Sequence, residues 1–163
     1  IKNDNIKTFI DVGSAWGYYS ICAKKLNKNI NVIGFDRVEG MNKNAYRNAK
    51  LNGITDIEFR IGAIGDTVRL EDIINEVQQI DLIKIDIQGA GTKALESAKS
   101  EIKNIKNIIL GTHGKEHDEC LELLQKHGFK IKLSLRANQI PIQPDGLIWA
   151  NNYEKVYHWE KIL

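Results

Sequence analysis

The sequence contains few or none of several features that mark particular classes of protein. Cysteine occurs only twice in 163 residues, at Cys22 and Cys120, which excludes a disulfide framework and a structural zinc site. No apolar run approaches the roughly 18 residues of a membrane span, and no apolar secretion leader opens the chain. We therefore expect a cytoplasmic protein in a reducing compartment, with no membrane partner.

An excess of charge of one sign is also missing. Lysine and arginine number 23 and aspartate and glutamate 21, so the formal net charge is +2. A dedicated nucleic-acid binder usually carries a concentrated basic excess, so the composition argues against a nucleic-acid partner. With 42% hydrophobic residues the chain can form one core, and we expect a single domain over residues 1–163. The chain begins with Ile1 rather than methionine, which leaves open whether an N-terminal segment is missing.

Short apolar runs alternate with helical stretches along the chain. We expect strands over residues 7–12, 31–35, 57–61, 81–87, 107–110, 129–135 and 147–150, and helices over residues 18–26, 39–51, 70–77, 92–100 and 115–127. Strand–helix alternation over the first five units predicts parallel strands. Only about ten residues join the last two strands, which is too short for a helical crossover. The sequence therefore predicts an α/β fold, a doubly wound, mostly parallel seven-stranded sheet with a C-terminal antiparallel β-hairpin.

Residues that follow the strands are candidate site residues, because such sheets bind ligands beyond the carboxyl ends of their strands. The turn after the first strand contains Asp11, Gly13, Ser14, Gly17 and Tyr18. Its glycines allow the backbone to approach a ligand closely. The spacing is GxxxG and not the GxGxxG of dinucleotide sites, and the Asp11 carboxylate suits a positively charged ligand group better than a pyrophosphate. An ordinary strand-to-helix turn capped by Asp11 is the alternative.

The second and third strands end in residues that suit a nucleoside. Asp36 lies 19 residues past Gly17, where a carboxylate accepts hydrogen bonds from ribose hydroxyls in nicotinamide and S-adenosylmethionine proteins alike. After the third strand, an adenine could stack on Ala63 or Ile64 with Asp66 nearby. A helix-capping role for Asp36 and a plain turn after the third strand are the alternatives.

The fourth and fifth strands end in ionisable residues. Asp86 lies where a carboxylate would meet the reacting end of a cofactor, although Lys84 points to the same strand face and a purely structural pair is the alternative. His113 follows the fifth strand at the same sheet edge and can take a proton near neutral pH. His113 and His117 are four residues apart, but no third ligand accompanies them, so no metal site is predicted. We expect Cys120 to be buried in a helix.

Taken in order, these motifs resemble the FkbM family of S-adenosyl-L-methionine (SAM)-dependent methyltransferases, which have a class I Rossmann-like fold. The segments that carry the resemblance are FIDVGSAWGYYS, VIGFDRVEGMNKNAYRNAKLNG, GAIGD, LIKIDIQGA and LLQKHGF, together with a fifth strand that ends in histidine, so it spans residues 7–151. Two glutamates of the family pattern are replaced by Gln88 and Gly91, and a third by Gly111. All three positions lie on the acceptor side, which indicates an altered substrate or reduced activity.

The resemblance implies SAM as cofactor and methyl transfer to a hydroxyl of a sugar, a glycan or another small molecule. His113 would act as the general base, with Asp86 as the second choice. The protein would mainly align the reactants, because the sulfonium makes methyl transfer chemically easy. The implied cofactor-binding residues are Asp11, Gly13, Ser14, Gly17, Tyr18, Asp36, Arg37, Ala63, Ile64, Asp66 and Asp86.

Other functions stay open at this point. Methylation of nucleic-acid amino groups is disfavoured, because Gln88-Gly-Ala90 stands where such DNA enzymes carry a Pro-Pro-aromatic motif. The lost glutamates favour a second reading, a non-catalytic domain that binds SAM or a partner. A nicotinamide-dependent oxidoreductase is a third, against which the GxxxG spacing and the terminal hairpin argue.

Overall fold

The computed structural model describes residues 6–139 and 145–152. The strands are β1 (Thr8–Val12), β2 (Asn31–Asp36), β3 (Glu58–Ile61), β4 (Leu82–Ile85), β5 (Asn107–Thr112), β6 (Lys130–Leu135) and β7 (Gly146–Asn151). The α-helices are α1 (Tyr18–Leu26), α2 (Glu39–Leu51), α3 (Leu70–Val77), α4 (Gly91–Glu96) and α5 (Glu116–Lys126), and the 3-10 helices are η1 (Lys99–Asn104) and η2 (Ala137–Gln139). Each predicted strand and helix overlaps one of these elements.

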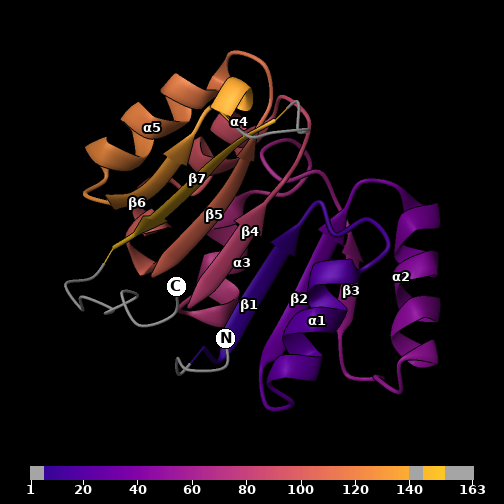
Figure 1. The fold of residues 1–163 in the computed structure, drawn as a ribbon. Coiled ribbons are helices and arrows are strands. Elements are labelled where there is room, and N and C mark those ends of the chain that lie inside the picture. The colour runs from indigo at the N-terminus through magenta and orange to yellow at the C-terminus, as the bar shows by residue number, and fades with distance from the viewer. Residues whose placement is uncertain (1–5, 140–144, 153–163) are drawn as a thin grey trace, which may run out of the picture.

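The seven strands form one sheet in the order β3-β2-β1-β4-β5-β7-β6 (Figure 1). Strands β1 to β5 pair in parallel, whereas β7 is antiparallel to both β5 and β6. The predicted fold is therefore confirmed, including the antiparallel hairpin. The strand order reverses between β1 and β4, and open parallel sheets bind ligands in the crevice beyond the strand ends at such a point.

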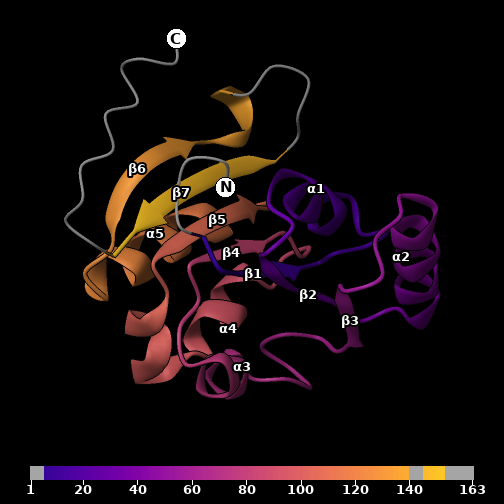
Figure 2. The same cartoon turned by 90° about the horizontal axis from the view of Figure 1, so that it is seen from below.

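Helices cover the two faces of the sheet unequally. Helices α1 and α2 pack on one face over β1, β2 and β3, whereas α3, α4 and α5 lie on the opposite face (Figure 2). On the α1 side, no α-helix in the described part of the chain covers β5, β7 and β6, and only the short 3-10 helix η2 contacts β7 (Figure 2). None of the described helices combines the length and the apolar character that crossing a membrane requires. The cytoplasmic location goes beyond that finding and stays a prediction.

The apolar core follows from the alternation of side chains along the strands. On β4, Ile83 and Ile85 are fully buried in the larger cluster, between the sheet and α3 to α5. A smaller cluster, which includes Phe59, lies under α1 and α2. Each fully buried side chain of this size stabilises the fold by roughly 1.5–3 kcal/mol. Cys120 is fully buried in α5, which confirms that prediction.

Two elements end earlier than predicted. Strand β4 stops at Ile85, so Asp86 and Gln88 lie beyond the sheet edge. The helix expected over 92–100 ends as α4 at Glu96, because the Ser97 hydroxyl donates a hydrogen bond to the Ala94 carbonyl (2.7 Å) and accepts one from the Leu70 amide (3.0 Å). A hydroxyl that binds the backbone in this way competes with helical hydrogen bonding.

Candidate active site

The turn after β1 brings the backbone close to the end of β4. Gly13 has φ +76°, and a Cβ there would overlap the Asp86 carbonyl oxygen. Gly17 has φ +80°, and a Cβ there would lie 2.9 Å from the Phe59 ring. Glycine is the residue that takes this backbone conformation without strain and leaves room at both contacts. The structure therefore explains both glycines of the GxxxG motif by conformation and close packing.

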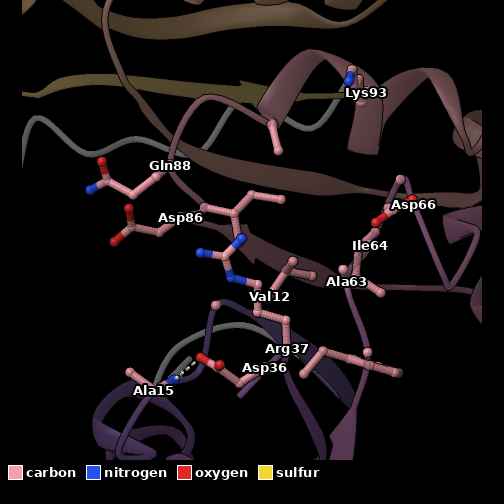
Figure 3. Close-up of a pocket in the computed structure, with 16 residues that line it drawn as sticks. Val12, Ala15, Asp36, Arg37, Ala63, Ile64, Asp66, Asp86, Gln88 and Lys93 are labelled. Carbon is pink, nitrogen blue, oxygen red and sulfur yellow. Dashed lines mark hydrogen bonds between the residues drawn. The ribbon is translucent and has the colours of Figure 1, made fainter.

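A cavity of about 490 Å³ opens beside this turn, beyond the carboxyl ends of β1 to β4 (Figure 3). Seven of the predicted site residues line it: Gly13, Asp36, Arg37, Ala63, Ile64, Asp66 and Asp86. The remaining lining residues were not predicted: Val12, Ala15, Phe35, Gly62, Gly65, Ile87, Gln88, Ala90 and Lys93. Most of these neighbour a predicted residue in the sequence. Lys93, on α4, had no sequence signal, since it reaches the cavity only through the packing of its helix.

Four other predicted residues, Asp11 among them, do not line the cavity. The Asp11 side chain is fully buried, and its Oδ2 accepts hydrogen bonds from the Ser20 hydroxyl (2.7 Å) and amide (3.2 Å). It therefore ties α1 to β1. Ser14 is buried in the turn, Gly17 packs on Phe59, and the Tyr18 side chain is exposed to solvent.

Asp36 is held in place and still has capacity to bind a ligand. Its Oδ2 accepts a hydrogen bond from the Ala15 amide (3.0 Å), and its Oδ1 accepts one from the Val38 amide (2.9 Å). A carboxylate offers about four lone-pair sites, so each oxygen keeps one for a further donor. Figure 3 shows the side chain at one end of the cavity, with Asp86 across from it. This arrangement suits a diol such as that of a ribose.

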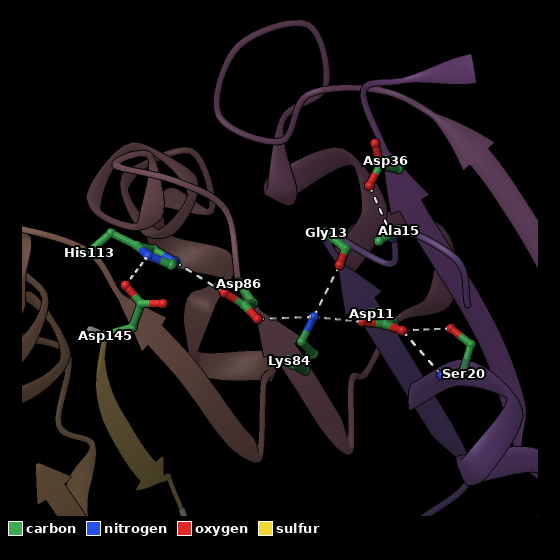
Figure 4. A network of polar contacts seen from close by, with 9 residues as sticks. All are labelled: Asp11, Gly13, Ala15, Ser20, Asp36, Lys84, Asp86, His113 and Asp145. Atoms are coloured by element: carbon green, nitrogen blue, oxygen red, sulfur yellow. Dashed lines mark hydrogen bonds and ion pairs between the residues drawn. The ribbon is translucent and has the colours of Figure 1, made fainter. Parts of the chain in front are cut away.

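A ladder of alternating charges runs along the sheet edge away from Asp36 (Figure 4). The buried Lys84 ammonium donates a hydrogen bond to the Gly13 carbonyl (3.1 Å) and lies 3.2 Å from Asp11 Oδ1 and 3.8 Å from Asp86 Oδ2. Lys84 and Asp86, whose pairing was given as the alternative to a functional Asp86, do form an ion pair, and Asp11 belongs to the same group. Buried charges persist only when they are paired, so this ladder fixes the glycine turn against β4.

His113 continues the ladder between two carboxylates. Its Nε2 lies 3.1 Å from Asp86 Oδ1 and its Nδ1 lies 2.8 Å from Asp145 Oδ1. Burial lowers the pKa of His113, but hydrogen bonds to Asp145 and Asp86 outweigh burial, so the pKa is raised above its ordinary value. Both ring nitrogens are therefore occupied by carboxylates, and whenever the ring is charged it has no lone pair with which to accept a proton. Asp145 was missed in the sequence, although it directly precedes β7.

His117 serves a different, internal contact. Its Nδ1 lies 2.7 Å from the Thr112 hydroxyl and its Nε2 lies 3.0 Å from the Ser134 hydroxyl. Burial, reinforced by the positive charge of Arg136, lowers the pKa of His117, so its ring is neutral at pH 7. It therefore joins α5 to β5 and β6. Within the described ranges, no three His, Cys, Asp or Glu side chains are placed to hold a metal ion.

Solved structures of known proteins share this fold. One is M. capricolum TrmK in complex with S-adenosyl-homocysteine (SAH), with a TM-score of 0.70, 20% identity, and 98% of this chain and 68% of that chain covered. Another is a ribosomal protein L11 methylase from Lactobacillus delbrueckii, with a TM-score of 0.65, 23% identity, and 90% and 70% covered. A third is Streptococcus pneumoniae Sp1610, assigned as a tRNA (m1A22) methyltransferase, with a TM-score of 0.67, 23% identity, and 93% and 67% covered.

A curated relative corrects the predicted acceptor. The chain is 27% identical over 144 residues to the release factor glutamine methyltransferase of Aliivibrio fischeri, with 81% of this chain covered. It spans about half the length of that relative, 49%. This relative is named for a protein acceptor, and Sp1610 is named for tRNA. The prediction of a small hydroxylated molecule as the partner, with nucleic acid disfavoured, is therefore wrong. The net charge of the whole chain does not identify the acceptor, because an acceptor contacts only the charged residues around its binding site.

A family model shows the family to which the chain belongs. Residues 3–158, nearly the whole chain, match a family model described as a methyltransferase domain. The predicted cofactor, SAM, is confirmed at this level, whereas the finer assignment to FkbM stays a prediction. The fold, the cavity beyond the strand ends and the family match agree with one another. The chain belongs to the methyltransferase-domain family, with the class I SAM-dependent methyltransferase fold.

Proposed function

We propose that this chain binds SAM in the cavity beyond β1 to β4 and transfers the methyl group to an acceptor carried by a protein or a nucleic acid. One observation carries the proposal. A single cavity has a backbone-held carboxylate, Asp36, at one end and a second carboxylate, Asp86, at the other, with the Cβ-free Gly13 turn between them. Its volume, about 490 Å³, is within the usual range for a cofactor of this size.

Each part of the cavity suits one part of the cofactor. The free lone pairs of Asp36 would accept hydrogen bonds from the ribose hydroxyls. Ala63 and the buried Ile64 would contact the adenine ring, and the Asp66 carboxylate would accept a hydrogen bond from the adenine amino group. The Gly13 turn would lie under the methionine portion. SAM supplies a methyl group on a positively charged sulfur, so the protein needs to bring an acceptor into line with it.

Asp86 and His113 would divide the work on the acceptor side. The Asp86 side chain is 46% exposed and borders the cavity, so it can accept a hydrogen bond from an incoming acceptor. His113, predicted as the base, uses both ring nitrogens on carboxylates and would instead fix the orientation of Asp86. We assign Asp86 as the residue that contacts the acceptor and His113 as a positioning residue.

The acceptor class rests on the relatives. A release factor and a tRNA are both macromolecules that present one reactive group to the enzyme. The relative is only 27% identical and the chain spans 49% of its length, so we carry over the macromolecular class of acceptor and not the glutamine itself. Within the family, the ordered motifs support an FkbM-type origin for the chain.

Calorimetric titration of the chain with SAM and SAH tests the cofactor site. We expect Asp36→Asn to weaken binding by about tenfold or more, because two hydroxyl donors lose a charged acceptor. Asp118→Asn is the matched control, since Asp118 lies on α5 and pairs with the exposed Arg136. Wild-type chain that binds neither compound at millimolar concentration would overturn the proposal. Tritium transfer from labelled SAM to protein or RNA fractions of a lysate then identifies the acceptor class.

A further inference from the structure

A second cavity, of about 330 Å³, lies on the sheet face that α1 covers only in part. We call it the acceptor groove. Phe9, Leu82, Ile109 and Leu147 form its apolar part, and it reaches Asp86, which also lines the first cavity. The two cavities therefore meet at one carboxylate.

Strand alternation produces the apolar part of the groove. Ile108 and Leu110 of β5 are fully buried on the side of α3 to α5, whereas Ile109 points to the α1 side and is only half-buried. Leu147 of β7 pairs with Gly111 of β5, and its side chain extends the apolar lining on the same face of the sheet. No described α-helix covers this stretch of the sheet (Figure 2). Half-buried apolar side chains in a contiguous row indicate a surface that a partner covers.

Gly111 keeps the groove open to Asp86. A Cβ at Gly111 would lie 2.9 Å from Asp86 Oδ1 and 3.2 Å from its Cγ. Any side chain at this position would therefore crowd the carboxylate and narrow the junction of the two cavities. The glutamate expected here from the FkbM resemblance would fill the junction, whereas glycine leaves the junction open and uncharged.

The charges at this end of the groove favour a cation. The side chains of Asp86 and Asp145 are 46% and 37% exposed. The two basic side chains that contact them, Lys84 and His113, are only 11% and 10% exposed. Negative charge is thus presented to solvent and positive charge is withdrawn from it. A nucleic-acid strand would bring its phosphates toward these carboxylates, which is unfavourable.

We propose that the acceptor groove binds a lysine side chain of a protein, with its amino group at Asp86 and Asp145 and apolar neighbours of that lysine on Ile109 and Leu147. A lysine combines a four-carbon apolar stem with a compact cation, which matches an apolar groove that ends in carboxylates. Charge complementarity and the apolar lining are the two observations that select this occupant. The proposal rests on the proposed function, because Asp86 acts only if SAM occupies the first cavity.

The transfer step balances without a further reagent. The amine enters as an ammonium and loses one proton to water. Its nitrogen then forms a bond with the methyl carbon while the carbon–sulfur bond breaks, and the sulfur keeps the bonding pair. The products are a methylated ammonium, stabilised by Asp86 and Asp145, and a neutral thioether.

The test uses the full chain loaded with SAH and three probes. The first is acetyl-Ala-Leu-Lys-Leu-Ala-amide, the second has norleucine in place of lysine, and the third is a short single-stranded oligoadenylate. We expect the lysine peptide to bind about tenfold more tightly than the norleucine peptide. Asp145→Asn should remove that preference, because its amide still accepts the His113 hydrogen bond but carries no charge. Asp118→Asn should keep the preference.

The apolar part of the groove is tested separately. Leu26→Gln, at the end of α1 within the groove, should weaken both peptides about equally. Leu51→Gln, at the end of α2, is its matched control and should change neither, although Leu51 is the more exposed leucine (76% against 47%). Equal binding of the two peptides, or tighter binding of oligoadenylate, overturns the lysine proposal while SAH binding still supports the proposed function. Failure of SAH to bind refutes both.

Discussion

Replacing Lys84 by methionine tests whether its buried ammonium balances the charge of Asp11. The residue is 8% exposed, and its Nζ lies 3.2 Å from Asp11 Oδ1 and 3.1 Å from the Gly13 carbonyl oxygen. Methionine nearly preserves the length of the side chain but removes both the charge and the donor. Within the described residues Asp11 Oδ1 has no hydrogen-bond partner, so the nearby ammonium is what balances its charge. Asp11 would keep only the two hydrogen bonds from Ser20 to Oδ2.

The cost follows from the burial of Asp11. Removing one partner of a buried ion pair destabilises a protein by about 3–5 kcal/mol, because the other charge stays buried without compensation. The contact with the half-exposed Asp86 adds little, since solvent screens it. In a chain of this length 1 kcal/mol corresponds to about 2–4 °C in Tm. We therefore expect Lys84→Met to lower the Tm by roughly 6–20 °C in thermal unfolding followed by circular dichroism.

Two variants make this result interpretable. Lys43→Met removes an exposed ion pair with Glu39 (2.9 Å) and should cost no more than about 1 kcal/mol. In the double variant Asp11→Asn with Lys84→Met no charge is left buried alone, so its destabilisation should fall short of the sum of the two single variants. If Lys84→Met cost as little as Lys43→Met, Lys84 would not be the internal counter-charge of Asp11, and our account of the ladder would be wrong.

Three further results are expected. Gly13→Ala should abolish SAM binding and lower the free energy of unfolding more than Gly53→Ala does, because both have positive φ but only Gly13 contacts the Asp86 backbone; calorimetry and urea unfolding measure this. Gly111→Ala should slow methyl transfer while SAH affinity stays within about twofold, since its Cβ crowds only the Asp86 side chain. The pKa of His113 is raised in the folded state, so its contacts with the two carboxylates stabilise the fold fully below about pH 6.5 and less as the pH rises through the folded-state pKa. The Tm difference between wild type and His113→Gln should therefore shrink with rising pH.

The sheet could be predicted because its parallel strands are apolar and regularly spaced by helices. The loops after β1 to β4 could then be assigned to one edge, and Gly13, Asp36 and Asp86 do line one cavity there. Asp11 could not be assigned in this way. It lies within β1, opposite Lys84 of β4, and the pleat turns its side chain under α1 rather than beyond the strand end.

Asp145 was missed although the sequence contained a signal for it. The hairpin was predicted to be antiparallel, so β7 starts at the edge where β5 ends, and Thr112 does pair with Gly146. A polar residue directly before β7 was therefore a candidate partner for His113. The contact between them could not be predicted further, because it depends on the orientation of the His113 ring.

The predicted acceptor came from the family resemblance, and the whole-chain charge, which was used only against a nucleic-acid partner, could not correct it. Asp145, His113, Asp86, Lys84 and Asp11 form a row of alternating acidic and basic side chains along the sheet edge, and a count of 23 basic against 21 acidic residues over the whole chain does not reveal it. An approaching ligand meets mainly the carboxylates of this row, because the Lys84 and His113 side chains are buried whereas Asp86 and Asp145 are partly exposed. A sequence cannot rank those exposures, since they depend on how far each side chain extends from the sheet. The field at the mouth of the groove is therefore a property of the fold, and it is the reason why we propose a cationic acceptor for a chain that is slightly basic overall.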